Sequence, residues 1–184
     1  MITFRKTTSY MMPHILMILA SKGFRDIEYI TPRAFFEQYG FKVSTASSSK
    51  ISKGRFGYQV KNDFLIEEVQ IKEFDGIYLV GGGGSLEYRT NDKARLLVEA
   101  FYVAHKPIAA ICAAPQNFLH WGLMKGKRVT GHNGDGLFPA LAIQFGAIPD
   151  VEKTVVYDGG ILTANGPEAA EESALEFMKL FRNE

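Results

Sequence analysis

The sequence predicts an α/β protein with an open, mostly parallel sheet that is covered by helices on both faces. Three observations lead to this fold class. Apolar runs of strand length recur at residues 15–19, 77–80 and 108–111, segments with helical spacing alternate with them, and no repeat or low-complexity segment interrupts that order. An unbroken apolar run is typical of a strand buried on both faces. Strands that alternate with helices form βαβ units and a parallel sheet.

Length and composition support a folded protein with one core. The chain has 184 residues, of which 46% are hydrophobic and 22% charged, and this size and balance are typical of a globular domain. We expect a single domain at residues 13–184, preceded by a polar, pattern-free leader at residues 1–12 that we expect to be flexible. Lys and Arg number 21 against 20 Asp and Glu, so the net charge of +1 does not favour nucleic acid or an anionic membrane.

The cysteine count and the hydropathy pattern indicate a compartment. A single cysteine cannot form a disulfide within the chain, and the start of the sequence does not match a secretory signal. The longest apolar stretches, such as residues 14–20, are far shorter than the ~20 residues that span a bilayer. We therefore expect a cytoplasmic protein with no membrane or nucleic-acid partner.

The first half of the chain contains one clear βαβ unit followed by a less regular segment. Gly40 follows the first helical pattern, and a glycine in this position is a common helix terminator. The predicted elements are a strand at residues 15–19, a helix at 27–39, a strand at 41–46, a loop with short hairpin strands at 47–73 and a strand at 77–80. The last of these strands leads directly into four glycines.

The second half continues the alternation. The predicted helices cover residues 91–105, 113–123, 136–145 and 168–181, and the predicted strands cover residues 108–111, 129, 155–157 and 161–163. The last helix has its apolar residues on one face. In an open parallel sheet, ligands bind outside the carboxyl ends of the strands, so the candidate functional residues are those that follow strands.

The only cysteine, Cys112, directly follows the apolar run at 108–111 and precedes Ala113, Ala114 and Pro115. Small residues permit a tight strand-to-helix turn that projects the side chain and aligns backbone N–H groups with it, as in a nucleophile elbow. A helix N-terminus also lowers the pKa of a nearby thiol. We expect an exposed, ionisable sulfur, although cysteine is equally common as inert packing.

The glycine run Gly81–Gly84 follows another buried strand. A backbone without side chains can approach a ligand closely and present N–H groups to a developing negative charge. The run does not match a dinucleotide or phosphate-loop fingerprint. Taken alone, it is equally consistent with a flexible turn.

Acidic and histidine side chains supply candidate proton donors and acceptors. Asp26 and Glu28 follow the first strand, where a carboxylate either caps a helix or, if buried beside a thiol, has a raised pKa. His132 follows a short strand and is the best candidate base by topology. His14 and His105 lie where structural roles are expected, and His120 is either packing or part of a pocket wall. No metal-binding motif is present.

Together these segments resemble the ThiJ/PfpI family of the class I glutamine amidotransferase-like superfamily. The likeness runs from residue 14 onward. The segments that carry it are Gly23 with Ile27-Glu28 and Pro32, residues 75–82 (DGIYLVGG), residues 108–115 (IAAICAAP), and residues 162–167 (LTANGP) with Ala174-Leu175.

The resemblance implies a flavodoxin-like, three-layer fold, a homodimer or larger homo-oligomer, and no cofactor. It also implies a reactive nucleophile at Cys112, a protonated carboxyl partner at Glu28 and a nearby histidine at His132. In the same way it implies that Gly82 and Ala113 provide backbone N–H donors for an oxyanion. The peptidase-like branch of the family carries histidine directly after the cysteine, where this chain has Ala113.

Three functions are compatible with this pattern. The first is stress-protective glyoxalase or deglycase chemistry, in which the Cys112 thiolate attacks the carbonyl of a small 2-oxoaldehyde or of its adduct. The second is a redox-sensing or chaperone-like dimer that uses oxidation of Cys112. The third, an intracellular cysteine peptidase with His132 as base, is disfavoured by Ala113.

Overall fold

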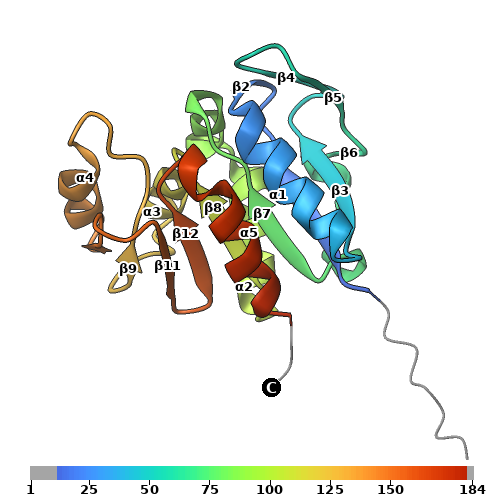
Figure 1. Ribbon diagram of the computed structural model, residues 1–184. Helices are drawn as coiled ribbons and strands as arrows, with labels where there is room; N and C mark the ends of the chain where they lie inside the picture. The colour runs from blue at the N-terminus through green and yellow to red at the C-terminus, as the bar shows by residue number, and fades with distance from the viewer. Residues whose placement is uncertain (1–11, 182–184) are drawn as a thin grey trace, which may run out of the picture.

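The computed structural model describes residues 12–181 and has a seven-stranded central sheet (Figure 1). The predicted leader lies outside the described residues except for Met12. Across the sheet the strands are β11 (Val155–Asp158), β12 (Ile161–Ala164), β8 (Ile108–Ile111), β7 (Gly76–Leu79), β1 (His14–Ile18), β3 (Lys42–Ser47) and β6 (Phe64–Leu65). Only β11 pairs antiparallel to its neighbour, and every other neighbouring pair is parallel. The predicted mostly parallel sheet is therefore confirmed.

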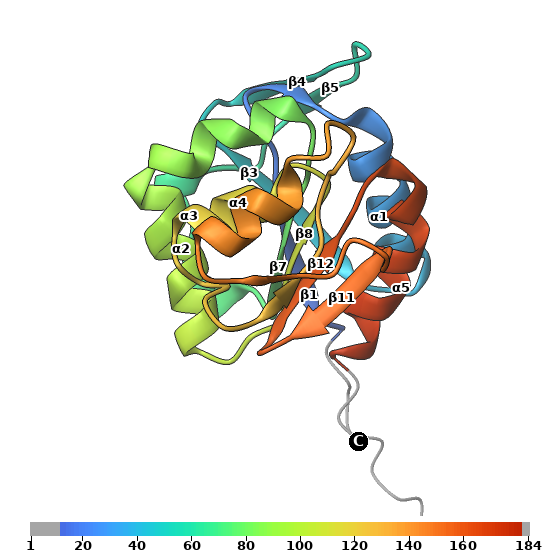
Figure 2. The same ribbon diagram turned by 90° about the vertical axis from the view of Figure 1, so that its left-hand side faces the viewer.

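Helices cover both faces of the sheet and produce three layers. Helices α1 (Asp26–Gln38) and α5 (Ala170–Lys179) pack on one face, whereas α2 (Asp92–Val103), α3 (Pro115–His120) and α4 (Phe138–Gln144) lie on the other (Figure 2). Phe36 of α1 and Phe177 of α5 contact Tyr78 of β7, with ring centroids 5.6 and 5.7 Å from the tyrosine ring. On the opposite face, Phe101 of α2 and Phe118 of α3 belong to a separate cluster of buried apolar residues.

The central strands owe their position to their apolar sequences. All four residues of β7 and of β8 are buried, as are the last four of β1. Burial of both faces of a strand is possible only where helices cover the sheet on each side. The apolar runs therefore place β1, β7 and β8 in the middle of the sheet, and their carboxyl ends lie side by side.

The irregular segment at residues 47–73 contributes two strands to a second, three-stranded sheet, and the sequence predicted only part of this arrangement. The predicted hairpin is β4 (Ile51–Gly54) with β5 (Gln59–Lys61), which pair antiparallel. The sequence did not predict β2 (Lys22–Phe24), which pairs parallel to β4, or the 3₁₀ helices at residues 66–68 and 71–73. Strands of three residues are too short for a recognisable periodicity.

Two expectations near the glycines and the cysteine are corrected. Residues 83–90 form a 3₁₀ helix, so the glycine run is the start of an ordered element and not a flexible turn. The helix predicted at 113–123 is the shorter α3, because Cys112 and the two alanines form the turn itself and Gly122 has a φ of 75°.

The predicted strand at residue 129 is β9 (Arg128–Val129), which pairs with the unpredicted β10 (Ile148–Pro149).

Among residues 12–181, no helix is long and apolar enough to cross a membrane. The ends of the described chain, Met12 and Phe181, both lie at the edge of the sheet opposite the carboxyl ends of β1, β7 and β8, since both line one hollow with His14 and Asp75.

Candidate active site

Cys112 occupies a tight turn between β8 and α3. Its φ is +63°, a left-handed conformation that costs energy in a residue with a side chain and recurs at functional sites. Backbone hydrogen bonds hold this turn: the Cys112 N–H donates to Ala164 O at 2.8 Å, and the His132 N–H donates to Cys112 O at 2.7 Å. The turn has the geometry of a nucleophile elbow, and both neighbouring segments of the chain fix it.

The glycine run makes this turn accessible to the rest of the site. A side chain at Gly81 would collide with Ile111 O and with the Glu28 carboxyl, and would lie 2.7 Å from Cys112 Cβ. One at Gly82 would lie 2.5 Å from the backbone nitrogen of Arg25. Neighbouring atoms therefore approach the backbone too closely for a side chain at Gly81 or Gly82. Gly81 leaves the space in which Glu28 and Cys112 meet.

Glu28 lies in the first turn of α1 and points into the interior. Its side chain is fully buried, and neither carboxyl oxygen has a hydrogen-bond partner that meets normal geometry among the described residues. Burial raises the pKa of Glu28 from its usual value to about 7, against the smaller lowering effects of the adjacent thiol and of the Arg25 charge. A carboxyl group in this environment is protonated far more often than an exposed one.

The Cys112 thiol differs from the sequence-based expectation. The residue is only 8% exposed, so the sulfur is not openly accessible. Burial first, and then the negative charge of ionised Glu28, raise the pKa of the thiol, whereas the backbone N–H groups of Gly82 and Ala113 lower it. The prediction of a lowered thiol pKa is therefore wrong for the state in which Glu28 is charged, because a short helix that begins at Pro115 cannot offset burial.

Glu28 and Cys112 form one titrating unit, because two buried acids in contact share their protons. Protonation of Glu28 removes the charge that opposes thiolate formation. The N–H groups of Gly82 and Ala113 then favour negative charge on sulfur. Thiolate formation at Cys112 is therefore least opposed while Glu28 is neutral, and ionised Glu28 keeps the proton on sulfur.

The structure places His132 beside the elbow through its backbone, while its side chain is exposed and lines the cleft above Cys112. No hydrogen bond joins its ring to the sulfur among the described contacts. None of the other three histidines lines this cleft. His14 bonds to Ser44 Oγ and Glu73 O at the far edge of the sheet, and His120 stacks on Phe145 at 4.4 Å.

Asp26, the alternative to Glu28, has a structural role. Its carboxylate accepts hydrogen bonds from the backbone N–H groups of Phe56 at 3.0 Å and Tyr58 at 2.9 Å. It therefore fixes the β4–β5 turn to the start of α1. The open choice between the two acids is resolved by geometry: Glu28 faces the thiol and Asp26 faces the hairpin.

These residues open onto a cleft of about 800 Å³ at the carboxyl edge of the sheet. This volume lies within the range of small-molecule sites. The cleft also contains Arg25, Arg55 and Gln116, which the sequence did not single out as functional residues. Arg25 directly precedes Asp26, one of the two candidate acids. Arg55 reaches the cleft only because the β4–β5 hairpin folds over the cleft. Within residues 12–181, no group of three or more His, Cys, Asp or Glu residues could hold a metal ion.

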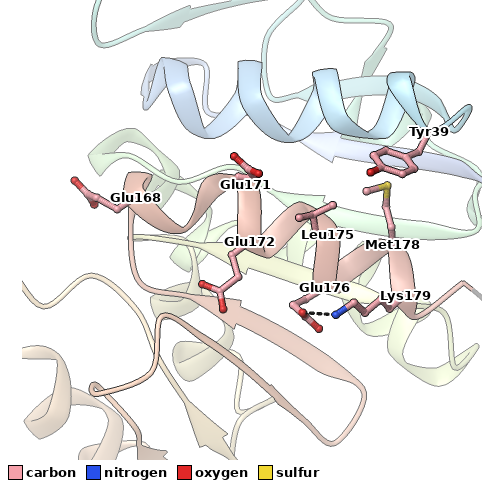
Figure 3. Close-up of a pocket in the computed structure, with 8 residues that line it drawn as sticks. All are labelled: Tyr39, Glu168, Glu171, Glu172, Leu175, Glu176, Met178 and Lys179. Carbon is pink, nitrogen blue, oxygen red and sulfur yellow. Dashed lines mark hydrogen bonds and ion pairs between the residues drawn. The ribbon is translucent and has the colours of Figure 1, made fainter.

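A second hollow, of about 520 Å³, lies between α5 and the end of α1 (Figure 3). Figure 3 shows the carboxylates of Glu171, Glu172 and Glu176 on α5 and that of Glu168 on the turn before it, with Glu176 paired to Lys179. Its lining residues are Tyr39, Glu168, Glu171, Glu172, Leu175, Glu176, Met178 and Lys179. It contains no cysteine or histidine, whereas Cys112, Glu28 and His132 all line the other cleft.

The fold and the site define an α/β protein with a cysteine nucleophile elbow and a buried carboxyl partner. A sequence model described as the DJ-1/PfpI family matches residues 13–180, and the chain belongs to this family. The predicted family membership is confirmed.

Individual relatives extend over almost the whole chain. Deglycase PfpI of Pyrococcus furiosus is 31% identical over 170 residues, which cover 91% of this chain and 99% of the relative. YraA of Bacillus subtilis, which carries a provisional cysteine-protease name, is 31% identical over 91% of this chain and 98% of its own. The crystal structure of Drosophila melanogaster DJ-1beta superposes with a TM-score of 0.83 at 30% identity and covers 92% of this chain and 91% of that one. The flavodoxin-like, three-layer fold is thereby confirmed.

Proposed function

We propose that the protein is a cysteine-dependent enzyme that acts on 2-oxoaldehydes or their adducts, as a cofactor-independent glyoxalase or deglycase. The contact between buried Glu28 and the Cys112 elbow is the observation that carries this proposal. The similarity to relatives named as deglycases supports it. A reducing compartment such as the cytoplasm, where Cys112 remains a free thiol, suits this chemistry.

The reaction begins with attack of the Cys112 thiolate on the aldehyde carbon, which forms a carbon–sulfur bond and a hemithioacetal. The N–H groups of Gly82 and Ala113 face the sulfur and would stabilise the negative charge that develops on the former carbonyl oxygen. Protonated Glu28 can supply the proton that this oxygen needs.

The remaining steps move a proton and consume one water. A base, Glu28 or His132, transfers the proton from the former aldehyde carbon to the neighbouring carbon, which converts the hemithioacetal into a thioester of a hydroxy acid. Water then attacks the thioester, the hydroxy acid leaves and the thiolate is regenerated. Oxidation at one carbon balances reduction at the other, so the sequence of steps needs no external oxidant or reductant.

The test is consumption of methylglyoxal with formation of lactate by purified protein. Replacement of the nucleophile in Cys112→Ala should lower kcat/KM by about a thousandfold or more. Glu28→Gln should also lower it, whereas Glu171→Gln changes an exposed carboxylate on α5 outside the cleft and should have little effect. Wild-type turnover that survives in Cys112→Ala would overturn the proposal.

The redox-sensing alternative gives a different result in the same preparation. Intact mass after mild peroxide treatment would show a selective gain of two oxygens at Cys112. Such a gain, without turnover of any 2-oxoaldehyde or adduct by the wild type, would assign the residue to sensing. The peptidase alternative has a relative's provisional name in its favour and Ala113 against it, and it requires cleavage of an unfolded protein substrate.

The assembly that we propose is a homodimer. The α1 helix exposes Ile27 and Ile30, at 46% and 39% of their surface, beside the cleft, and neighbouring exposed apolar residues are typical of interfaces. Sedimentation of wild type and Ile27→Glu at the same concentration tests this, with Leu96→Glu, an exposed apolar residue on α2, as the control. A wild type that sediments as a monomer would contradict the proposal.

A further inference from the structure

Two arginine side chains line the Cys112 cleft without an acidic partner. Arg25 lies at the junction of β2 and α1, and Arg55 lies at the end of β4. Among the ion pairs and side-chain hydrogen bonds of residues 12–181, neither guanidinium contacts a carboxylate. A guanidinium without a carboxylate partner beside a reactive residue is available to an anionic ligand, and its planar donors match carboxylate and phosphate oxygens.

The local structure holds these two arginines in place. The Arg55 N–H donates to Phe24 O at 2.8 Å, which brings the hairpin against the residue before Arg25. The Asp26 hydrogen bonds to the same turn fix its conformation. The Arg25 guanidinium lies 4.7 Å from the ring centroid of Phe56, a side chain that is 67% exposed. An exposed aromatic ring gains little from burial, and its contact with Arg25 orients the guanidinium.

The cleft is divided by charge. On the β7 side of Cys112, the Arg25 N–H donates to Gly81 O and the Arg55 N–H donates to Phe24 O, the residue before Arg25, so both arginines belong to that wall. On the β12 side, the wall carries the carboxylates Asp135 and Glu168 in the segments that follow His132 and Asn165. A substrate with its carbonyl at Cys112 therefore meets cationic groups on one side only.

The size of the cleft supports a substrate larger than methylglyoxal. A volume of about 800 Å³ exceeds what a three-carbon aldehyde fills and is typical of sites for much larger ligands. We propose that the carbonyl substrate carries an anionic oxygen group, a carboxylate or a phosphate, which Arg25 and Arg55 bind while the carbonyl carbon lies at Cys112. This inference rests on the proposed function, since it names the class of carbonyl compound that the site selects.

The first experiment compares two probes that differ only at the end remote from the aldehyde: 4,5-dioxopentanoate, a 2-oxoaldehyde that ends in a carboxylate, and its uncharged methyl ester. In the wild type, kcat/KM for the carboxylate should exceed that for the ester by about tenfold or more, the size of a hydrogen bond to a charged group. In Arg55→Gln and Arg25→Gln this ratio should fall through a higher KM for the carboxylate, and in the double variant it should approach one.

Lys53→Gln is the matched control, since it removes a positive charge from the same hairpin at an exposed residue outside the cleft. The ratio in this variant should stay at the wild-type value. Equal efficiency with the two probes in the wild type, or a ratio that Lys53→Gln lowers as much as Arg55→Gln, would overturn the inference and leave the proposed reaction intact.

Two further measurements distinguish the anion source and separate the inference from the reaction. Comparison of competitive inhibition by inorganic phosphate with that by glutarate shows which oxygen group the arginines prefer. If neither compound inhibits but the enzyme still prefers 4,5-dioxopentanoate to its ester, the anionic group is a carboxylate on the substrate chain. Calorimetry with Cys112→Ala measures binding of 4,5-dioxopentanoate without turnover. Binding that requires Arg55, together with no wild-type turnover of any carbonyl probe, would retain the anion site and overturn the reaction. If the protein neither binds 4,5-dioxopentanoate through Arg55 nor turns over any carbonyl probe, the anion site and the proposed reaction are both overturned.

Discussion

Polar groups are hydrogen-bonded to different extents at the two ends of the central strands, which we call the amino edge and the carboxyl edge of the sheet. At the amino edge, His14 uses both ring nitrogens, with Glu73 O and Ser44 Oγ each 2.9 Å away, and Asp75 accepts the His14 N–H at 2.8 Å. Lys106 donates to the carbonyl oxygens of two residues that precede β7. These groups are paired within the fold, as expected for buried or half-buried polar atoms.

At the carboxyl edge, pairing is incomplete. Glu28 is buried with both carboxyl oxygens unpartnered among the described residues, and Cys112 has a positive φ, which His105 at the amino edge also has. Unsatisfied buried groups and strained dihedrals each cost free energy. The comparison indicates that the amino edge contributes to stability, whereas the carboxyl edge lowers stability in order to keep reactive groups together.

The largest effect should follow from filling the space at the carboxyl edge. Gly81→Ala places a methyl group against Ile111 O and the Glu28 carboxyl, so we expect a loss of about 3 kcal/mol in the free energy of unfolding, since such overpacking cannot relax into a rigid backbone. The thermal midpoint should fall by roughly 6 to 12 °C. Thermal unfolding followed by circular dichroism measures it.

Gly83→Ala is the matched control for this change, because a methyl group there meets nothing within 4 Å and the residue does not have a positive φ. Its thermal midpoint should remain within about 2 °C of the wild type. A Gly81→Ala variant as stable as Gly83→Ala would show that Glu28 and Cys112 do not meet in the space that the structure gives them.

Glu28→Gln should separate stability from chemistry. The folded-state pKa of Glu28 is raised to about 7, so its contribution to stability is present below pH 4.5 and is lost as the pH rises through 7. An amide does not ionise. We expect the variant to be more stable than the wild type at pH 8 by about 1 to 3 kcal/mol, with the difference shrinking at pH 5.

Denaturant unfolding at both pH values measures this difference, with Glu37→Gln as the control on the exposed face of the same helix. A wild type that is more stable than Glu28→Gln at pH 8 would mean that ionised Glu28 has a partner the structure does not contain. The same titration predicts that wild-type kcat/KM falls as the pH rises through 7, because ionised Glu28 opposes thiolate formation at Cys112 and no longer supplies a proton, and that this fall is absent in Glu28→Gln.

The parts of this site that depend on local sequence could be predicted, since they follow from the order of residues along one segment. The apolar run before Cys112 and the small residues after it predict the elbow, and the structure has that turn. Gly40 predicts the end of α1 and adopts a positive φ there. The central strands were also predictable, because an unbroken apolar run between turn residues indicates a strand buried on both faces.

The parts that depend on distant segments could not be predicted from one sequence. Arg55 reaches the cleft through β4 and β5, whose three or four residues have no clear period, and through hydrogen bonds to Asp26 from across the turn. The helix N-terminus argument for a low thiol pKa is local. Burial and the charge of Glu28 oppose it, and both arise only when the first turn of α1 meets the turn that follows β8.

The smallest effect is expected at the amino edge, where His14 forms hydrogen bonds through both ring nitrogens. Because Glu73 O can only accept, Nδ1 of His14 donates to it, and in the neutral ring Nε2 then accepts from the Ser44 hydroxyl. Burial, followed by the charge of Lys42, lowers the pKa of His14. The wild type should therefore lose stability as the pH falls below about 6.5, the unfolded value.

His14→Gln should be less stable than the wild type at pH 8 by about 1 kcal/mol, the typical cost of lost hydrogen bonds at a half-buried site. Its stability should also depend less on pH between 8 and 5, since glutamine does not titrate. His105→Asn removes a histidine at the same end of the molecule and keeps a residue that tolerates the positive φ of that position. An equal loss of pH dependence in both variants would contradict the assignment of this dependence to His14 and would weaken the contrast between the two edges.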